Sequence, residues 1–126
     1  MNWLIWIIIA AIGIFILLKR LTLVQPEAVR DLLKRGAKVI DVRSEAEFAE
    51  GHIPGAINIP LNRLGNEIHR FAADKQQPIL LHCLSGGRSG IARTVLKKLG
   101  YSQCFNLGSF SRAQKLIQTS AGSSQR

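Results

Sequence analysis

The sequence predicts an α/β fold in which a mostly parallel sheet is covered by helices on both faces. Short apolar segments typical of buried strands alternate along the chain with segments whose apolar residues recur at helical spacing. This alternation favours a parallel sheet, because a parallel pair of strands needs a crossover, which is usually a helix. About a hundred residues follow an N-terminal apolar stretch, and that length suits one such core but not two.

Helices are indicated by end signals as well as by apolar spacing. The first is expected from Pro26 to Lys34, because proline suits a first turn and Gly36 follows the end. A short helix is expected after Ser44, which forms a capping-box pattern with Glu47 and should bury a phenylalanine, Phe48. Three further helices are indicated by apolar spacing, around residues 61–71, 89–99 and 111–117.

Strand-like segments lie between these helices, and each is a short, mostly apolar run bounded by polar residues or glycine. Cys104 lies within the last run and is expected to be a core residue. Residues 119–126 are polar and small, and we expect them to form a disordered tail after a domain spanning 22–118. The expected strands are 39–42, 56–59, a segment beginning at 79, and 104–107.

The amino terminus predicts a single transmembrane helix over residues 1–21. From Trp3 to Leu18 there is no charged or strongly polar side chain, and Lys19 and Arg20 follow directly. A secretory signal peptide would place basic residues first and a small-residue cleavage site afterwards, and neither pattern is present. A helix of that apolar run is about 24 Å long, so snorkelling of the two basic side chains or local thinning would complete the span.

Basic residues indicate how this helix is oriented. The chain has 17 Lys plus Arg against 8 Asp plus Glu, a net charge of +9, and a cluster of the basic residues follows the apolar run. The positive-inside rule therefore predicts an inner-membrane protein whose domain faces the cytoplasm, with its basic flank against anionic lipid headgroups. The remaining charge favours small anionic substrates. Nucleic acid is not an expected partner, because the few aromatic residues offer no stacking platform.

A candidate reactive cysteine, Cys83, lies between a predicted strand and a predicted helix. Gly86 and Gly87 follow it at short range and allow several backbone N–H groups to converge, and Arg88 adds a full positive charge. The N-terminus of the following helix adds a partial positive charge. All three features stabilise a thiolate, or an anion attached to it.

The length of this loop separates two chemistries. Cysteine-dependent phosphatases also close such a loop with arginine, but they place five residues between the two. Here four residues separate Cys83 from Arg88. A shorter ring of amides encloses a smaller anion, so a sulfur atom carried by the cysteine fits better than a tetrahedral phosphate does.

The Cys-x-x-Gly-x-Arg-Ser loop resembles that of single-domain rhodaneses. The segments Val39-Ile40-Asp41-Val42-Arg43 and Gly51-His52-Ile53-Pro54-Gly55-Ala56 are similar to further signatures of that family, and together the matching segments cover roughly 22–117. The resemblance implies a rhodanese-like domain with a mostly parallel five-stranded sheet, and a sulfurtransferase activity. Sulfur would pass from a donor such as thiosulfate, through a persulfide on Cys83, to cyanide, a small thiol or a protein acceptor.

Roles at the site follow from the same resemblance. Cys83 is the expected catalytic residue, and Arg88 with the loop amides is expected to hold the donor and the terminal sulfur. Asp41 and Arg43 are interpreted as structural, with Arg43 pairing either Asp41 or Glu47. No cofactor and no metal are expected, and His82 is interpreted as a packed histidine. The expected substrate-binding residues are Leu84, Ser85, Gly86, Gly87, Arg88 and Ser89.

An alternative function remains open at this point. Where the family usually shows a Gly-Gly pair and then a tryptophan, this chain has Gly108-Ser109-Phe110 and no tryptophan. The alternative is therefore a membrane-tethered regulatory or sulfur-relay binding module with a rhodanese fold and little turnover.

Overall fold

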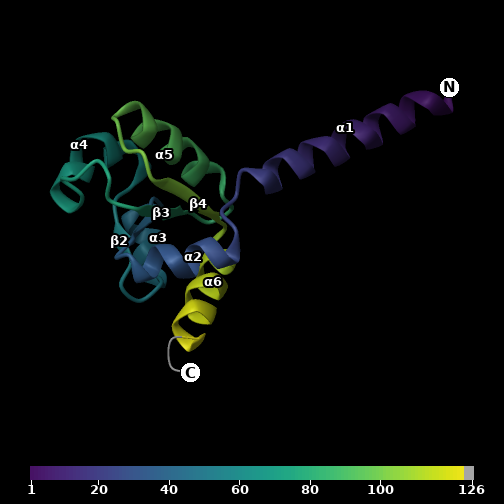
Figure 1. Ribbon diagram of the computed structural model, residues 1–126. Coiled ribbons are helices and arrows are strands. Elements are labelled where there is room, and N and C mark those ends of the chain that lie inside the picture. Colours follow the sequence, from purple (N-terminus) through teal and green to yellow (C-terminus); the bar gives the residue numbers. More distant parts are fainter. Residues whose placement is uncertain (124–126) are drawn as a thin grey trace.

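The structure, a computed structural model, describes residues 1–123 as an N-terminal helix joined to an α/β domain (Figure 1). Each helix and strand expected from the sequence has a counterpart, with ends shifted by a few residues. In chain order the elements are α1 (Asn2–Leu21), α2 (Pro26–Lys34), β1 (Lys38–Asp41), α3 (Glu45–Glu50), β2 (Ile57–Asn58), α4 (Leu61–Phe71), β3 (Ile79–His82), α5 (Gly87–Lys98), β4 (Cys104–Gly108) and α6 (Phe110–Ser123).

The sheet has four parallel strands in the order β2-β1-β3-β4 within the described residues, so the expectation of five strands is wrong. Beside β4 there is only an isolated parallel bridge between Leu23 and Asn106. Because α1 ends at Leu21 and α2 begins at Pro26, the segment between the two helices has four residues, and it meets β4 at Leu23 and Val24 through this single bridge rather than a ladder.

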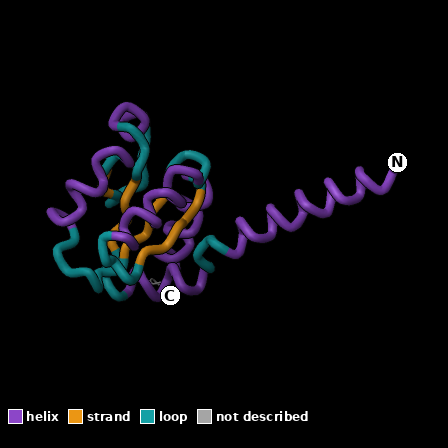
Figure 2. The backbone as a smooth tube through the Cα atoms, turned by 90° about the horizontal axis from the view of Figure 1, so that it is seen from above, coloured by secondary structure: helices purple, strands orange, loops and turns teal. Residues whose placement is uncertain are grey.

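Helices lie on both sides of the sheet (Figure 2), and an apolar layer is buried on each face. On one face α4 and α5 bury Leu64, Ile68 and Leu96 against the strands. On the other face α2 and α6 bury Val29 and Ala113. The Cys83 side chain belongs to the first layer, so the candidate nucleophile is buried at the edge of the loop and not exposed at the surface.

Two local expectations differ from the structure. Phe48 is only half-buried, because α3 lies at the surface, and its ring stacks on His52 with centroids 3.8 Å apart. Residues 119–123, expected to be disordered, continue α6 as helix. There the Thr119 and Ser120 hydroxyls donate to carbonyl groups one turn back, at Lys115 and Leu116, so the polar side chains do not compete with the helix. The rest of the expected tail, 124–126, lies outside the described residues.

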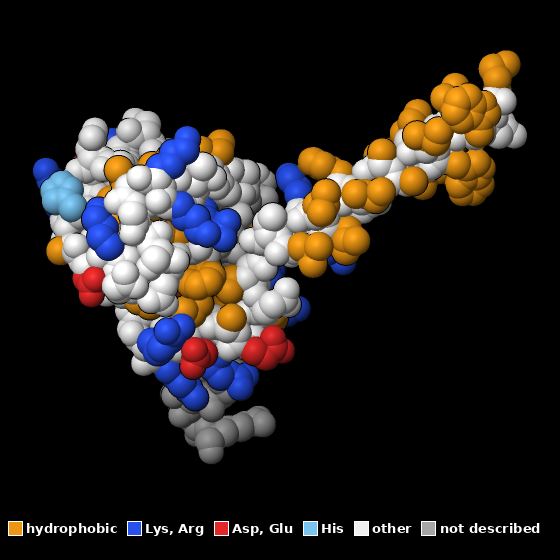
Figure 3. Space-filling view, turned by 45° about the horizontal axis from the view of Figure 1, so that its top comes forward, with side chains coloured by type: hydrophobic (Ala, Val, Ile, Leu, Met, Phe, Trp, Pro, Cys, Tyr) orange, Lys and Arg blue, Asp and Glu red, His pale blue; other side chains and the backbone are white. Residues whose placement is uncertain are grey.

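Helix α1 projects from the domain and none of its residues is buried (Figure 3). It has 20 residues and a mean hydropathy of 2.4, so by length and composition it could cross a membrane. Its end is continuous with the domain through Thr22 and Leu23.

Candidate active site

The Cys83 loop connects the end of β3 to the start of α5, as the sequence predicts. Gly86 caps α5 with φ +98°, a left-handed conformation that favours glycine. A Cβ at Gly86 would also lie 3.3 Å from the Cα of Gly108 on β4. Glycine is therefore needed here both for the turn and for the close approach of the loop to β4.

The Cys83 sulfur points into this loop and accepts hydrogen bonds from it. The Gly86 and Ser89 backbone N–H groups donate to Sγ, with N···S distances of 2.9 and 3.4 Å, and the Ser89 hydroxyl oxygen lies 3.5 Å from Sγ. Burial by itself raises the pKa of the Cys83 thiol. The hydrogen-bond contact with the Ser89 hydroxyl and the hydrogen bonds from the N–H groups of Ser89, Gly86 and Ser85 outweigh it, so the pKa lies below its ordinary value.

The second cysteine, Cys104, has the opposite environment. Both cysteines are free and buried, but burial raises the pKa of Cys104 to about 11. Its thiol lies 3.7 Å from the Tyr101 carbonyl oxygen, to which it donates. The structure thus offers one activated thiol and one inert core thiol.

Arg88 forms an ion pair with Glu47. Its two terminal nitrogens lie 2.7 and 3.0 Å from the two carboxylate oxygens of Glu47. This pairing, helped by a hydrogen bond from the Ser44 backbone, lowers the pKa of Glu47 to about 2. The guanidinium is thus shared with a carboxylate on α3, although the sequence analysis assigned it to a bound anion alone.

Asn106 on β4 is a site residue that the sequence analysis missed. Its Oδ1 accepts from the Ser89 hydroxyl at 2.7 Å and from the Gly108 N–H at 2.9 Å, and its Nδ2 lies 3.4 Å from the Gly86 carbonyl oxygen. Asn106 therefore connects the loop to the neighbouring strand. The available signal was a single amide side chain within an otherwise apolar strand pattern.

We expect Asn106→Leu to impair the thiol without unfolding the domain. Loss of the Asn106 amide removes its contacts to the Gly86 carbonyl and the Gly108 N–H, which tie the loop to β4. The N–H donors around Sγ are then held less firmly, so the pKa of Cys83 should rise and its alkylation near neutral pH should slow by roughly tenfold. The pH dependence of Cys83 alkylation measures the first effect. Asn66→Leu, at an exposed position on α4, is the matched control, and identical alkylation profiles in the two variants would exclude this role for Asn106.

Asp41 and Arg43 form a buried ion pair at the end of β1, as their structural interpretation requires. Arg43 donates through Nε and Nη2 to Asp41 Oδ2 at 3.0 and 2.8 Å, and Nη2 also donates to the Gly51 carbonyl at 2.7 Å. Of its two expected partners, Arg43 therefore pairs with Asp41. Its guanidinium also lies 4.5 Å from the ring centroid of Phe110.

His82 is fully buried next to this pair, and neither ring nitrogen has a hydrogen-bond partner of normal geometry among the described residues. Burial lowers the pKa of His82 below 6.5. The Asp41 carboxylate and the nearby Cys83 backbone oppose this effect only in part. The ring is thus packed and neutral, in agreement with its interpretation as a core histidine.

This burial predicts a loss of stability in mild acid. Below pH 6.5 the unfolded chain binds a proton at His82 that the folded chain resists, so the free energy of unfolding should fall as the pH drops from 7.5 to 5. His82→Leu should reduce that slope in urea unfolding. The control is His69→Leu on the surface of α4, and equal slopes in the two variants would assign the effect elsewhere.

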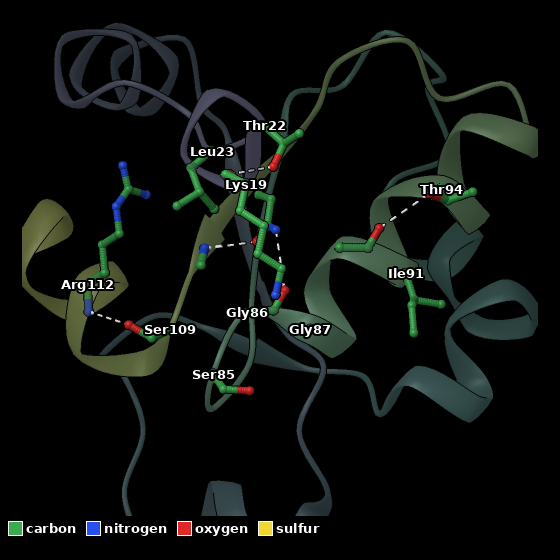
Figure 4. Close-up of a pocket in the computed structure, with 13 residues that line it drawn as sticks. Lys19, Thr22, Leu23, Ser85, Gly86, Gly87, Ile91, Thr94, Ser109 and Arg112 are labelled. Carbon is green, nitrogen blue, oxygen red and sulfur yellow. Dashed lines mark hydrogen bonds between the residues drawn. The ribbon is translucent and has the colours of Figure 1, made fainter. Parts of the chain in front are cut away.

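Two cavities flank the loop. One, of about 370 Å³, is lined by Arg88 together with the segments after β1 and β2. The other, of about 420 Å³, lies between the loop, β4 and the end of α1 (Figure 4). Residues 1–123 contain no group of three or more His, Cys, Asp or Glu side chains that could hold a metal. What the loop offers chemically is a thiol with backbone N–H donors around its sulfur.

Comparisons with known proteins agree with this arrangement. Residues 25–115 match the family model of the rhodanese-like domain. The thiosulfate sulfurtransferase GlpE of Pseudomonas fluorescens is 32% identical over 105 residues, which cover 81% of this chain and 94% of GlpE. The thiosulfate sulfurtransferase PspE of Escherichia coli is 36% identical over 69 residues, 55% of this chain and 66% of PspE.

A solved structure gives the same result for the fold. The human single-domain sulfurtransferase TSTD1 is 28% identical, with a TM-score of 0.62 over 75% of this chain and 96% of that one. The family model covers most of the domain, including the loop that activates Cys83. This chain therefore belongs to the rhodanese-like family.

Proposed function

We propose that the protein is a membrane-anchored sulfurtransferase that carries sulfane sulfur as a persulfide on Cys83. The observation that carries this proposal is the position of Sγ, which receives N–H hydrogen bonds from Gly86 and Ser89 inside a glycine-rich loop. The same donors that lower the pKa of the thiol also favour an anionic terminal sulfur in its place. Two relatives named thiosulfate sulfurtransferase support the reaction class.

The proposed reaction has two displacement steps at sulfur. The Cys83 thiolate attacks the outer sulfur of thiosulfate, the sulfur–sulfur bond of the donor breaks, and sulfite leaves with the electron pair. The outer sulfur remains on Sγ as a persulfide within the ring of amides from Leu84 to Ser89. An acceptor, cyanide or a thiolate, then attacks that sulfur and returns the electron pair to Sγ.

Arg88 is proposed to bind the anionic end of the donor at the cavity on its side of the loop. Arg88→Ala should raise the apparent KM for thiosulfate about ten- to a hundred-fold. Glu47→Gln is the informative companion, because it removes the carboxylate that competes for the guanidinium, and it should lower that KM. If neither variant changes the KM, the arginine only braces the loop.

We propose that α1 anchors the domain to the inner membrane, with the domain on the cytoplasmic side. The helix is apolar on every face and none of its residues is buried, and Lys19 and Arg20 are at its domain end. The full chain should remain in the membrane fraction after a carbonate wash. A cleaved signal sequence would instead release a soluble domain that begins after α1.

Thiosulfate:cyanide turnover by the full chain in lipid vesicles, with mass spectrometry of the loaded protein, tests the activity. We expect thiocyanate formation and a mass increase of one sulfur atom. A protein with neither thiocyanate nor an adduct would contradict the proposal. A stable adduct with background turnover would support the second candidate, a regulatory or sulfur-relay module. This candidate is favoured by Gly108-Ser109-Phe110 without a tryptophan, where the family usually shows a Gly-Gly pair and then a tryptophan.

A further inference from the structure

The connection between α1 and the domain is short and fixed. Only Thr22 separates the end of the helix from Leu23, which bridges to Asn106 on β4. The Val24 N–H donates to the Asn106 carbonyl at 3.1 Å, and Arg112 donates to the Val24 carbonyl at 2.7 Å. These contacts lie within three residues of the helix end, so the domain cannot swing freely away from it.

This connection places the catalytic loop beside the end of the helix. The cavity of about 420 Å³ is lined at one wall by Lys19 and Thr22, and at the other by Ser85, Gly86 and Gly87 (Figure 4). Lys19 is the first charged residue after the apolar run, so its ammonium marks the level of the lipid headgroups. Ser85, Gly86 and Gly87 of the Cys83 loop therefore share a cavity with Lys19, the residue that marks the level of the headgroups.

The charge and polarity of this cavity indicate what could enter it. Lys19 and Arg112 are its charged lining residues in the described part of the chain, and no acidic side chain lines it. Ile91 contributes an apolar rim and is 57% exposed. Cations next to an apolar surface favour an approaching thiol in its thiolate form, carried on an amphipathic segment.

We propose that the sulfur acceptor is a cysteine of another membrane protein, presented at headgroup level next to the loop that carries Cys83. The proposal rests on the proposed function, and it adds the class of acceptor. The acceptor thiolate attacks the outer sulfur of the Cys83 persulfide, the bond to Sγ breaks, and the electron pair returns to Cys83 as thiolate. The acceptor leaves as a persulfide, so no oxidant or reductant is consumed.

The test compares two positions of one acceptor thiol in vesicles that contain the full-length protein. A model transmembrane peptide carries its single cysteine either at headgroup level or at the end of a flexible tail of about twelve residues. After loading with thiosulfate, mass spectrometry follows the peptide persulfide. We expect the headgroup-level cysteine to be modified at least about tenfold faster, because the fixed connection raises its effective concentration at the loop.

The matched variant inserts eight Gly and Ser residues between Leu21 and Thr22, which lets the domain move up to about 26 Å from the helix end. The insertion should reduce the preference to less than about twofold and leave thiosulfate:cyanide turnover unchanged. The same eight residues added after Arg126 are the control and should preserve the preference.

The outcomes separate the two proposals. Absence of both the Cys83 adduct and cyanide turnover would contradict the sulfurtransferase function itself. Normal turnover with equal rates at the two cysteine positions would overturn the acceptor proposal alone. A preference that survives the insertion would also overturn it, because the fixed connection would then not be its cause.

Discussion

Cys83→Ser should abolish sulfur transfer, with thiocyanate formation falling to background and no sulfur adduct on the protein. A hydroxyl has no accessible anionic form near neutral pH, and oxygen cannot replace the polarizable thiolate in attack on sulfur. The loop donors that stabilise the sulfur would remain in place, so the variant should still fold. Activity assays and intact-protein mass spectrometry measure both effects.

Cys104→Ala is the control for this experiment. Burial raises the pKa of the Cys104 thiol to about 11, which removes it as a nucleophile. The Ala variant should therefore keep the sulfur adduct and the turnover, with some loss of stability from the small cavity it leaves in the core. An adduct on Cys104, or turnover that persists in Cys83→Ser, would contradict the assignment of the nucleophile.

Asp41→Ala should lower the free energy of unfolding by about 3–5 kcal/mol, because it leaves the Arg43 guanidinium buried without its partner. Both side chains are almost completely shielded, so solvent does not screen the lost charge. The double variant Asp41→Ala with Arg43→Met should recover most of the loss, because it removes the second charge as well. Urea unfolding midpoints, compared at equal slopes, provide the measurement.

Glu45→Ala is the comparison for an exposed ion pair. Glu45 pairs with Arg63 at the surface, where such pairs contribute less than about 1 kcal/mol. If Asp41→Ala costs no more than Glu45→Ala, the buried pair does not hold the end of β1. Arg43, which follows the end of β1 by two residues, also donates to the Gly51 carbonyl.

The fold was predictable wherever local signals agreed with the tertiary structure. Pro26 and Gly36 mark the ends of α2, and the capping box of Ser44 and Glu47 is present in α3. The extension of α6 through residues 119–123 was not predictable in this way, because its composition is typical of a tail. Hydroxyls that bond to the preceding turn make such residues compatible with a helix, and composition alone does not reveal that bonding.

At the candidate site, too, features that depend on neighbouring residues were predictable, and features that depend on distant elements were not. The sequence places Cys83 and its glycines on one loop, since these residues are neighbours in the chain. The partners of that loop come from distant elements: Glu47 on α3 binds Arg88, and Asn106 on β4 binds Ser89. Pairings of this kind depend on the order of strands in the sheet. One sequence without its fold therefore indicates the candidate nucleophile but not the groups that orient its surroundings.

The segment that joins α1 to the domain also protects an open strand edge. Strand β4 pairs with β3 on one side only. The carbonyl groups of Cys104 and Asn106 accept hydrogen bonds from residues outside the sheet. Arg93 donates to the first at 2.9 Å, and the Val24 N–H donates to the second at 3.1 Å. Proteolysis just after Val24 would therefore leave the Asn106 carbonyl without its partner. Unpaired strand edges promote strand pairing between molecules. A domain separated from α1 in this way would be prone to self-association, so the attachment of α1 and the protection of this strand edge depend on the same few residues.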